Sequence, residues 1–136
     1  MKHLVSSLVI ICLIFLLVAC SSDSPEAAAK DWMQAFADLD GNKIAARTCA
    51  EQQENLQEAG MWISAFTIFG QMTIGQESQI DISDLKYATI SSTDDTAQVR
   101  VTGQVRAAIL ALSQAQDIDE TWRMVREDGE WKWCGQ

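Results

Sequence analysis

The sequence is poor in several residue types that direct a fold or a reaction. Its 136 residues include one proline, seven glycines and one histidine. So little proline and glycine excludes a collagen-like or low-complexity chain. The histidine is His3, in a segment that we expect to be removed. The mature protein is therefore expected to have neither His-based catalysis nor a His-ligated metal.

Basic residues are also scarce. The chain has 10 Lys and Arg against 19 Asp and Glu, which gives a formal net charge of −9. Binding of nucleic acid needs a basic face that displaces counterions, so we expect no nucleic-acid partner. The length fits one domain and leaves no room for a second.

The first twenty residues have the pattern of an export signal. A short positive segment, 1–3, precedes an apolar run over 4–18 that only Ser6 and Ser7 interrupt. Because a membrane-spanning helix needs roughly 20 apolar residues, this shorter run is typical of a secretory signal peptide. The run ends in Leu17-Val18-Ala19-Cys20, which resembles the lipobox of bacterial lipoproteins.

The resemblance implies a signal peptide over 1–19, a lipid on the Cys20 thiol and a short tether over 20–24. The protein would then be lipid-anchored and extracytoplasmic, on the bacterial cell membrane or the outer membrane. Four residues after the cysteine reach about 14 Å. Loss of Lys2 would make the net charge −10, which an anionic surface repels, so adhesion would depend on the acyl chains. The alternatives are an ordinary signal peptide with a chance cysteine and a retained anchor helix.

The remaining cysteines predict one disulfide. Cys12 leaves with the signal peptide and Cys20 carries lipid, so Cys49 and Cys134 remain in an oxidising compartment. A reactive or metal-binding thiol pair is the alternative. Two cysteines far apart in sequence, without histidine, make a poor zinc site, and we expect no metal and no cofactor.

Two helices are predicted at the start of the domain. Ser24, Pro25 and Glu26 form an N-terminal helix signal, and an apolar face follows at helical spacing, made of Trp32, Ala35, Phe36 and Leu39. Asp40-Gly41 ends this helix. Asn42 is the expected cap of a second, short helix over 43–51.

A third helical stretch is predicted over 52–72, with a break at Gly60. Its second half, 61–72, is nearly all apolar. We expect a buried core helix, and the alternatives are a dimer interface or a surface that contacts the membrane.

After Gly75 the hydrophobic period changes to two, which predicts strands. The first covers 80–89 with an offset near 83–84, and the turn 92–95 follows it. The clearest alternation runs over 97–107, and 113–116 is expected to be a loop. A third strand covers 118–126, and Asp128-Gly129 predicts a two-residue hairpin to a last strand that begins at Trp131.

Helices followed by an antiparallel meander indicate an α+β domain with a curved sheet of about four strands. Three segments give this order a family resemblance: Leu39-Asp40-Gly41-Asn42, the strand end Val99-Arg100-Val101-Thr102-Gly103, and Asp128-Gly129-Glu130-Trp131-Lys132. The domain, 25–136, resembles the NTF2-like superfamily of cone-shaped α+β proteins, and within it the DUF4878 and lumazine-binding-like lipoproteins. The resemblance implies a sheet wrapped around helices with an apolar pocket. Some members are isomerases, dehydratases or cyclases, and many are non-catalytic.

Glu120 is the one carboxylate that the alternation places on an apolar strand face, with Ile118, Trp122 and Met124. A carboxylate in such a position can act as an acid or a base. The alternatives are a bulge in the strand, or an ion pair with Arg106 or Arg126.

The candidate pocket residues are those that the NTF2-like cone would bring together: Trp62, Phe66, Tyr87, Glu120, Trp122 and Trp131. Aromatic walls suit small molecules, although these residues and Trp133 can equally be core. The four arginines of the predicted sheet, Arg100, Arg106, Arg123 and Arg126, are expected to pair with acidic neighbours rather than to bind an anionic ligand.

We expect a non-catalytic, membrane-anchored module that binds a small apolar ligand or a protein partner at the cell envelope, since no catalytic set of residues is evident. An NTF2-like enzyme with a carboxylate base is one alternative. The other is a structural envelope component, with homodimer formation through the sheet or the 61–72 helix as one form of it.

Overall fold

The computed structural model describes residues 24–56, 79–109 and 112–136. Helix α2 (Pro25–Ala37) is followed by the short helix α3 (Gly41–Ala46) and a 3-10 turn, η1 (Ala50–Gln52). The strands are β1 (Gln79–Asp81), β2 (Lys86–Ser92), β3 (Thr96–Ile109), β4 (Leu112–Glu127) and β5 (Glu130–Trp133). The α+β prediction is confirmed. The helix predicted over 52–72 is described only up to residue 56, and residues 53–56 are helical. The signal peptide, Cys20 and the apolar half over 61–72, with Trp62 and Phe66, lie outside the described residues.

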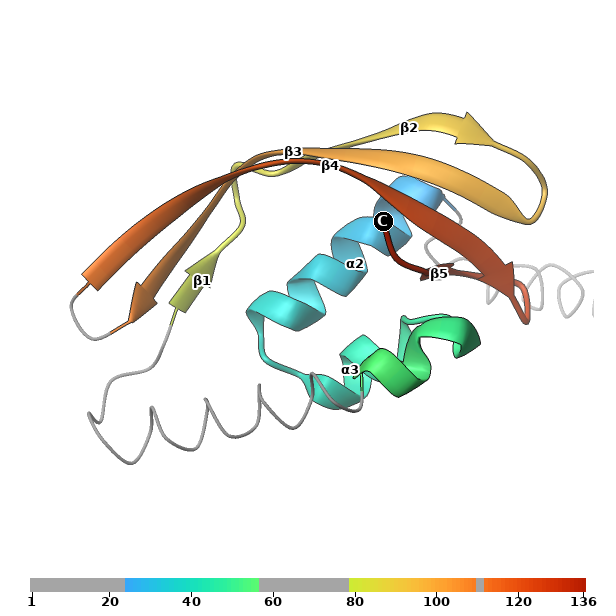
Figure 1. Cartoon of the computed structure of the whole chain (residues 1–136), viewed down its shortest axis with the longest axis horizontal. Helices are drawn as coiled ribbons and strands as arrows, with labels where there is room; N and C mark the ends of the chain where they lie inside the picture. The colour runs from blue at the N-terminus through green and yellow to red at the C-terminus, as the bar shows by residue number, and fades with distance from the viewer. Residues whose placement is uncertain (1–23, 57–78, 110–111) are drawn as a thin grey trace, which may run out of the picture.

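One antiparallel sheet contains all five strands, in the order β1-β3-β4-β5, and β2 also pairs with β3. The sheet arches over α2, which lies on its concave side, and α3 lies below α2 (Figure 1). Among the described residues, no helix is long and apolar enough to cross a membrane.

The start of α2 is the one that the sequence predicts. The Ser24 hydroxyl accepts a hydrogen bond of 3.1 Å from the Ala27 amide, and Pro25 opens the helix. Glu26 accepts from the Thr89 amide at 2.9 Å, which joins this helix end to the edge strand β2. The buried face includes the small Ala28 and Ala29, so the helix axis can approach the sheet closely.

The second helix differs from the prediction. It covers Gly41–Ala46 rather than 43–51, and its N-cap is Asp40, whose carboxylate accepts from the Lys43 amide at 3.0 Å. Asn42 was the expected cap, but Leu39 turns the chain with a φ of 55°, so the helix begins two residues earlier.

The strand predicted over 80–89 is two strands, so the sheet has five strands rather than about four. β1 pairs with residues 106–108 of β3, and β2 pairs with residues 97–102. Between them the chain bends at 82–85, where its backbone passes close to Gly103. Gly103 has a φ of +132°, a conformation that residues with a Cβ adopt only at a cost in free energy. The offset expected near 83–84 is therefore a break between two strands.

Residues 113–116, predicted as a loop, belong to β4. They pair in register with residues 105–108 of β3, for example Ser113 with Ala108. The segment Ser113-Gln114-Ala115-Gln116 has little strand preference of its own, and the long β3–β4 hairpin imposes the extended conformation on it.

The core lies between α2 and the concave face of the sheet. The alternation in β3 and β4 is confirmed, since Val99, Val101, Trp122 and Met124 are buried while their chain neighbours face outward. The two-residue hairpin is also confirmed, with positive φ at Asp128 and Gly129. The predicted disulfide joins Cys49 to Cys134 and ties the segment after α3 to the end of the chain.

Candidate functional site

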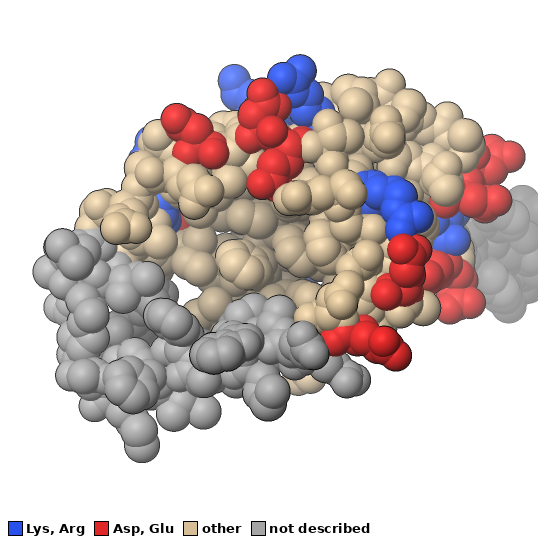
Figure 2. Space-filling model, viewed as in Figure 1, with Lys and Arg blue, Asp and Glu red and all other residues tan. Residues whose placement is uncertain are grey.

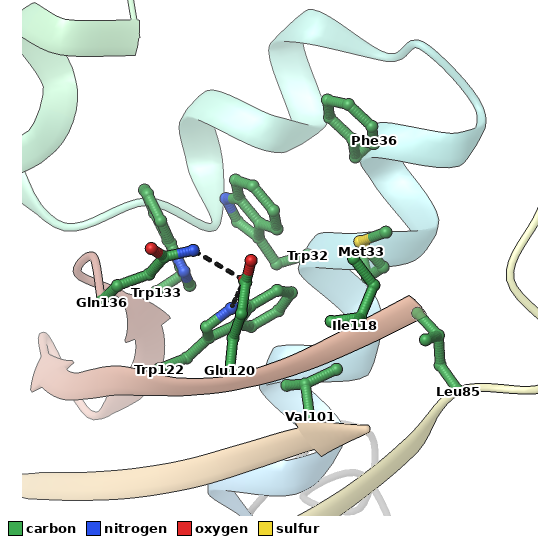
Figure 3. A pocket seen from close by; sticks show the side chains of 10 residues that line it. All are labelled: Trp32, Met33, Phe36, Leu85, Val101, Ile118, Glu120, Trp122, Trp133 and Gln136. Carbon is green, nitrogen blue, oxygen red and sulfur yellow. Dashed lines mark hydrogen bonds between the residues drawn. The ribbon is translucent and has the colours of Figure 1, made fainter. Parts of the chain in front are cut away.

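A pocket of about 190 Å³ lies between α2 and the concave face of the sheet. Eight of its ten lining residues are apolar or aromatic and two are polar: Trp32, Met33, Phe36, Leu85, Val101, Ile118, Trp122 and Trp133, with Glu120 and Gln136 (Figure 3). In the space-filling view, the hollow under the arch shows mainly uncharged side chains, and most charged ones lie outside it (Figure 2). An engineered cavity of about 150 Å³ holds benzene, so this volume suits a compact ligand.

Helix α2 supplies one wall through Trp32, Met33 and Phe36, which its turn places on one side. The Trp32 indole is fixed because its Nε1 donates to the Thr48 hydroxyl at 2.9 Å. That hydroxyl donates in turn to the Ile44 carbonyl at 2.7 Å, and Thr48 is fully buried. The orientation of this wall therefore depends on a residue that does not touch the pocket.

Three indoles form what we call the tryptophan cluster: Trp32, Trp122 and Trp133. Trp32 stacks on Trp133 with ring centroids 4.5 Å apart and meets Trp122 edge-on at 5.4 Å. Trp122 and Trp133 are also edge-on, at 6.4 Å. Such mutual contacts restrict the rings, so the aromatic side of the pocket is preformed.

Glu120 lies beside this cluster and is half-buried. Its Oε2 accepts hydrogen bonds from Trp122 Nε1 at 2.9 Å and from Gln136 Nε2 at 2.6 Å, as the dashed lines in Figure 3 show. Neither a bulge nor an ion pair accounts for its place. Arg106 binds Asp84 and Asp81, and Arg126 lies over the Trp131 ring, 5.8 Å from its centroid.

Three of the four sheet arginines, Arg100, Arg106 and Arg123, pair with carboxylates as expected, and Arg126 is the exception among the described residues. Arg100 binds Asp119 at 2.8 Å on the outer face of the sheet, and Arg123 binds Glu51 at 2.7 Å. The Arg100 guanidinium holds the pKa of the exposed Asp119 carboxyl below its ordinary value through a hydrogen bond and charge attraction. These groups are exposed and lie away from the pocket lining.

The structure separates the residues that the sequence grouped as pocket candidates. Glu120 and Trp122 line the pocket, whereas Tyr87 and Trp131 pack in the core without lining it. Burial raises the pKa of Tyr87 to about 12, and no described residue hydrogen-bonds its hydroxyl. Trp62 and Phe66 lie outside the described residues.

No pattern in the sequence indicated that Gln136 belongs to this site. Its position depends on contacts between distant segments: the Cys49–Cys134 disulfide, and hydrogen bonds of 2.8 Å that Arg123 exchanges with Cys134 and Gly135. The predicted pocket also lacked six apolar lining residues: Trp32, Met33, Phe36, Leu85, Val101 and Ile118. Their apolar side chains on a helix face, on strands and in a bend were signals of burial, but not of a cavity.

The structure has an NTF2-like fold: helices followed by a curved antiparallel sheet that encloses a pocket. Among solved structures it is similar to a ketosteroid isomerase-like protein from Erwinia carotovora atroseptica, with a TM-score of 0.54 and 18% identity over 80% of this chain and 89% of the other. A SEC-C motif-containing protein from Rhodopseudomonas palustris matches with a TM-score of 0.58 and 20% identity, over 90% of this chain and 84% of the other. A protein of unknown function from Mycobacterium tuberculosis matches with a TM-score of 0.56 and 16% identity, over 81% and 67%.

At these identities the likeness extends to the fold and no further. No family model matches the chain, and no curated protein matches its sequence. Within the described ranges, no three His, Cys, Asp or Glu side chains come together where they could hold a metal ion. The chemistry of the site must therefore be argued from its own residues.

Proposed function

We propose that this protein is a bacterial envelope lipoprotein, anchored through Cys20, whose domain binds a small apolar ligand without transforming it. The observation that carries the proposal is the preformed apolar pocket, with its tryptophan cluster and one carboxylate. Concave sites lined by apolar and aromatic side chains with a few polar groups are typical of small-molecule binding. The short tether would hold this pocket close to the bilayer, where apolar compounds concentrate.

The alternative of an enzyme rests on Glu120 and on the fold that the chain shares with a ketosteroid isomerase-like protein. Proton transfer within a substrate needs a base and a group that stabilises the developing charge. Among the described residues that line the pocket, Glu120 is the only ionisable one, so no second acid or base stands opposite it. The neutral donors of the lining side chains are the Gln136 amide and the indole N–H groups, of which Trp133 Nε1 has no hydrogen-bond partner among the described residues. Since one half-buried carboxylate without a second ionisable group is a sparse catalytic set, binding is the better-supported function.

Ligand binding can be tested with toluene and the full chain carrying Cys20→Ser, which removes only the site of lipid attachment. We expect saturable quenching of tryptophan fluorescence and a higher Tm, because a ligand that binds only the folded state stabilises it. Ile118→Phe fills the pocket and should weaken binding by about tenfold or more. Thr121→Phe, on the exposed face of the same strand, is the matched control and should bind as the parent does.

The proposal of a ligand pocket fails if toluene produces no saturable change in the folded parent protein. It fails equally if Ile118→Phe and Thr121→Phe bind with the affinity of the parent. A competing substrate screen would favour the enzyme if turnover appeared in the parent and disappeared in Glu120→Gln.

The anchor is tested separately in a bacterial host. Labelled fatty acid should be incorporated into the parent chain and recovered with it in the membrane fraction. Cys20→Ala should lose the label, whereas Cys12→Ala should retain it, since Cys12 would leave with the signal peptide. Equal labelling of parent and Cys20→Ala would contradict lipid attachment at Cys20.

A further inference from the structure

The one charged side chain in the described lining of the pocket is a carboxylate. Glu120 is half-buried, and no Lys or Arg of the described residues lies within 4.0 Å of its carboxylate. All five arginines have other partners. Four form ion pairs with carboxylates: Arg47 with Asp31 and Glu130, Arg100 with Asp119, Arg106 with Asp84, and Arg123 with Glu51. Arg126 donates to the Gly129 carbonyl and lies over the Trp131 ring. Removing a carboxylate from water is costly unless an opposite charge accompanies it.

Hydrogen bonds compensate Glu120 on one side only. Both of its donors, Trp122 Nε1 and Gln136 Nε2, bind the same oxygen, Oε2. None of the described residues donates to Oε1. The carboxylate thus keeps acceptor capacity for a group that the described chain does not provide.

The aromatic surroundings favour the same kind of ligand. Trp122 donates a hydrogen bond to Glu120 from the Nε1–H edge of its ring, and the indoles of Trp32 and Trp133 line the same pocket. Tryptophan is the side chain that best attracts cations through its ring face. The remaining wall, from Met33 to Leu85 and Ile118, is apolar and suits the hydrocarbon part of the ligand (Figure 3).

We infer that the pocket selects small apolar amines: compounds with one protonated nitrogen, which binds Glu120, and a compact hydrocarbon body, which fills the apolar side. The volume of about 190 Å³ limits that body to roughly one ring or a short branched chain. Anionic compounds of similar size, such as short fatty acids and aromatic carboxylates, are repelled by the Glu120 carboxylate, which has no ion-pair partner among the described residues. The net charge of −9 on the whole chain repels them as well. This inference rests on the proposed function, since it names the ligand class of the same pocket.

Three probes with one ring and different charge separate the inference from the proposed function: toluene, benzylamine and benzoate. With the full chain carrying Cys20→Ser, we expect benzylamine to bind about tenfold tighter than toluene. Benzoate should not bind at concentrations where toluene saturates. Added salt should weaken benzylamine and leave toluene unchanged.

Two variants test the residue that is held responsible. Glu120→Gln should reduce the affinity for benzylamine to that for toluene while the affinity for toluene stays the same. Gln136→Ala removes a competing donor and should retain or increase the preference for benzylamine, which keeps the inference testable if Glu120→Gln does not fold. Binding of toluene without a preference for benzylamine, or a preference that survives Glu120→Gln, overturns the inference and leaves the apolar pocket standing. Failure of toluene and benzylamine alike overturns the proposed function itself.

Discussion

Single buried polar atoms decide much of how this core is arranged. Thr48 accepts from Trp32 and donates to Ile44, so one hydroxyl satisfies an indole and the last turn of α3. Tyr87 is the contrasting case, because its hydroxyl is buried and has no hydrogen-bond partner among the described residues. Buried groups of the first kind stabilise the fold, and those of the second kind cost free energy.

Tyr87 therefore predicts a pH effect on stability. Its pKa is raised to about 12 in the folded protein, against about 10 in an unfolded chain. The folded state holds this proton more tightly than the unfolded state does. Its contribution to the free energy of unfolding is therefore fully present below pH 10 and is lost as the pH rises towards 12.

We expect Tyr87→Phe to lose this alkaline dependence and to raise the free energy of unfolding at pH 7 by about 1 kcal/mol. Urea denaturation of the parent and the variant at pH 7 and pH 11 measures both effects. The other titrating groups are common to the two proteins and cancel in the comparison. An identical loss of stability at pH 11 in both proteins would show that Tyr87 is not responsible.

Among the elements, β3 is the strand that determines the shape of the sheet. It pairs with β1 at one end, with β2 at the other and with β4 along its whole length. Gly103 lies between the two shorter partners, and a Cβ there would collide with the Asp84 carbonyl oxygen. In β2, a register shift between Thr89 and Ser91 leaves Ile90 54% exposed.

Gly103→Ala should lower the free energy of unfolding by about 3 kcal/mol, because the alanine meets both a positive φ and the backbone of the bend. Gly41→Ala is the matched control, since a Cβ at Gly41 meets nothing within 4 Å and its φ is not positive. Urea denaturation followed by circular dichroism gives both values. Equal stability of the two variants would contradict the close approach at Gly103.

The elements also show which patterns in the sequence were sufficient. Ser24-Pro25-Glu26, the alternation around Val99 and Val101, and Asp128-Gly129 each specify a conformation through their own residues. Ser113-Gln114-Ala115-Gln116 does not, because its strand is imposed by pairing with residues 105–108. The same holds for the caps, where Asp40 and not Asn42 binds the helix end.

At the scale of the whole molecule, the disulfide links segments separated by 85 residues. It brings the end of the chain, including Gln136, against β4 and therefore against the pocket. A crosslink of this span restricts the unfolded chain, and on the chain-entropy account it stabilises the folded state by about 4.5 kcal/mol.

The double variant Cys49→Ala/Cys134→Ala should lose about 4 kcal/mol of unfolding free energy, because its unfolded chain is no longer crosslinked. The full chain carrying Cys20→Ser, which retains the disulfide, is the reference, and urea denaturation gives the free energy of unfolding of both proteins. Two reactive thiols in the denatured, unreduced domain would show that the bond does not form in the cell.

The sequence by itself determined the class of fold, the alternation of the long strands, the first helix cap, the last hairpin and the cysteine pair. Most of these features follow from residues close together in the chain, and the cysteine pair followed from the expectation that Cys12 and Cys20 are not available for pairing. Only the tertiary structure decided that Glu120 lies beside the tryptophan cluster and is bonded to Gln136 rather than to an arginine. That arrangement depends on where the curved sheet, α2 and the disulfide bring distant residues together. Periodicity and spacing in the sequence predict neither the depth of a pocket nor the charges around it.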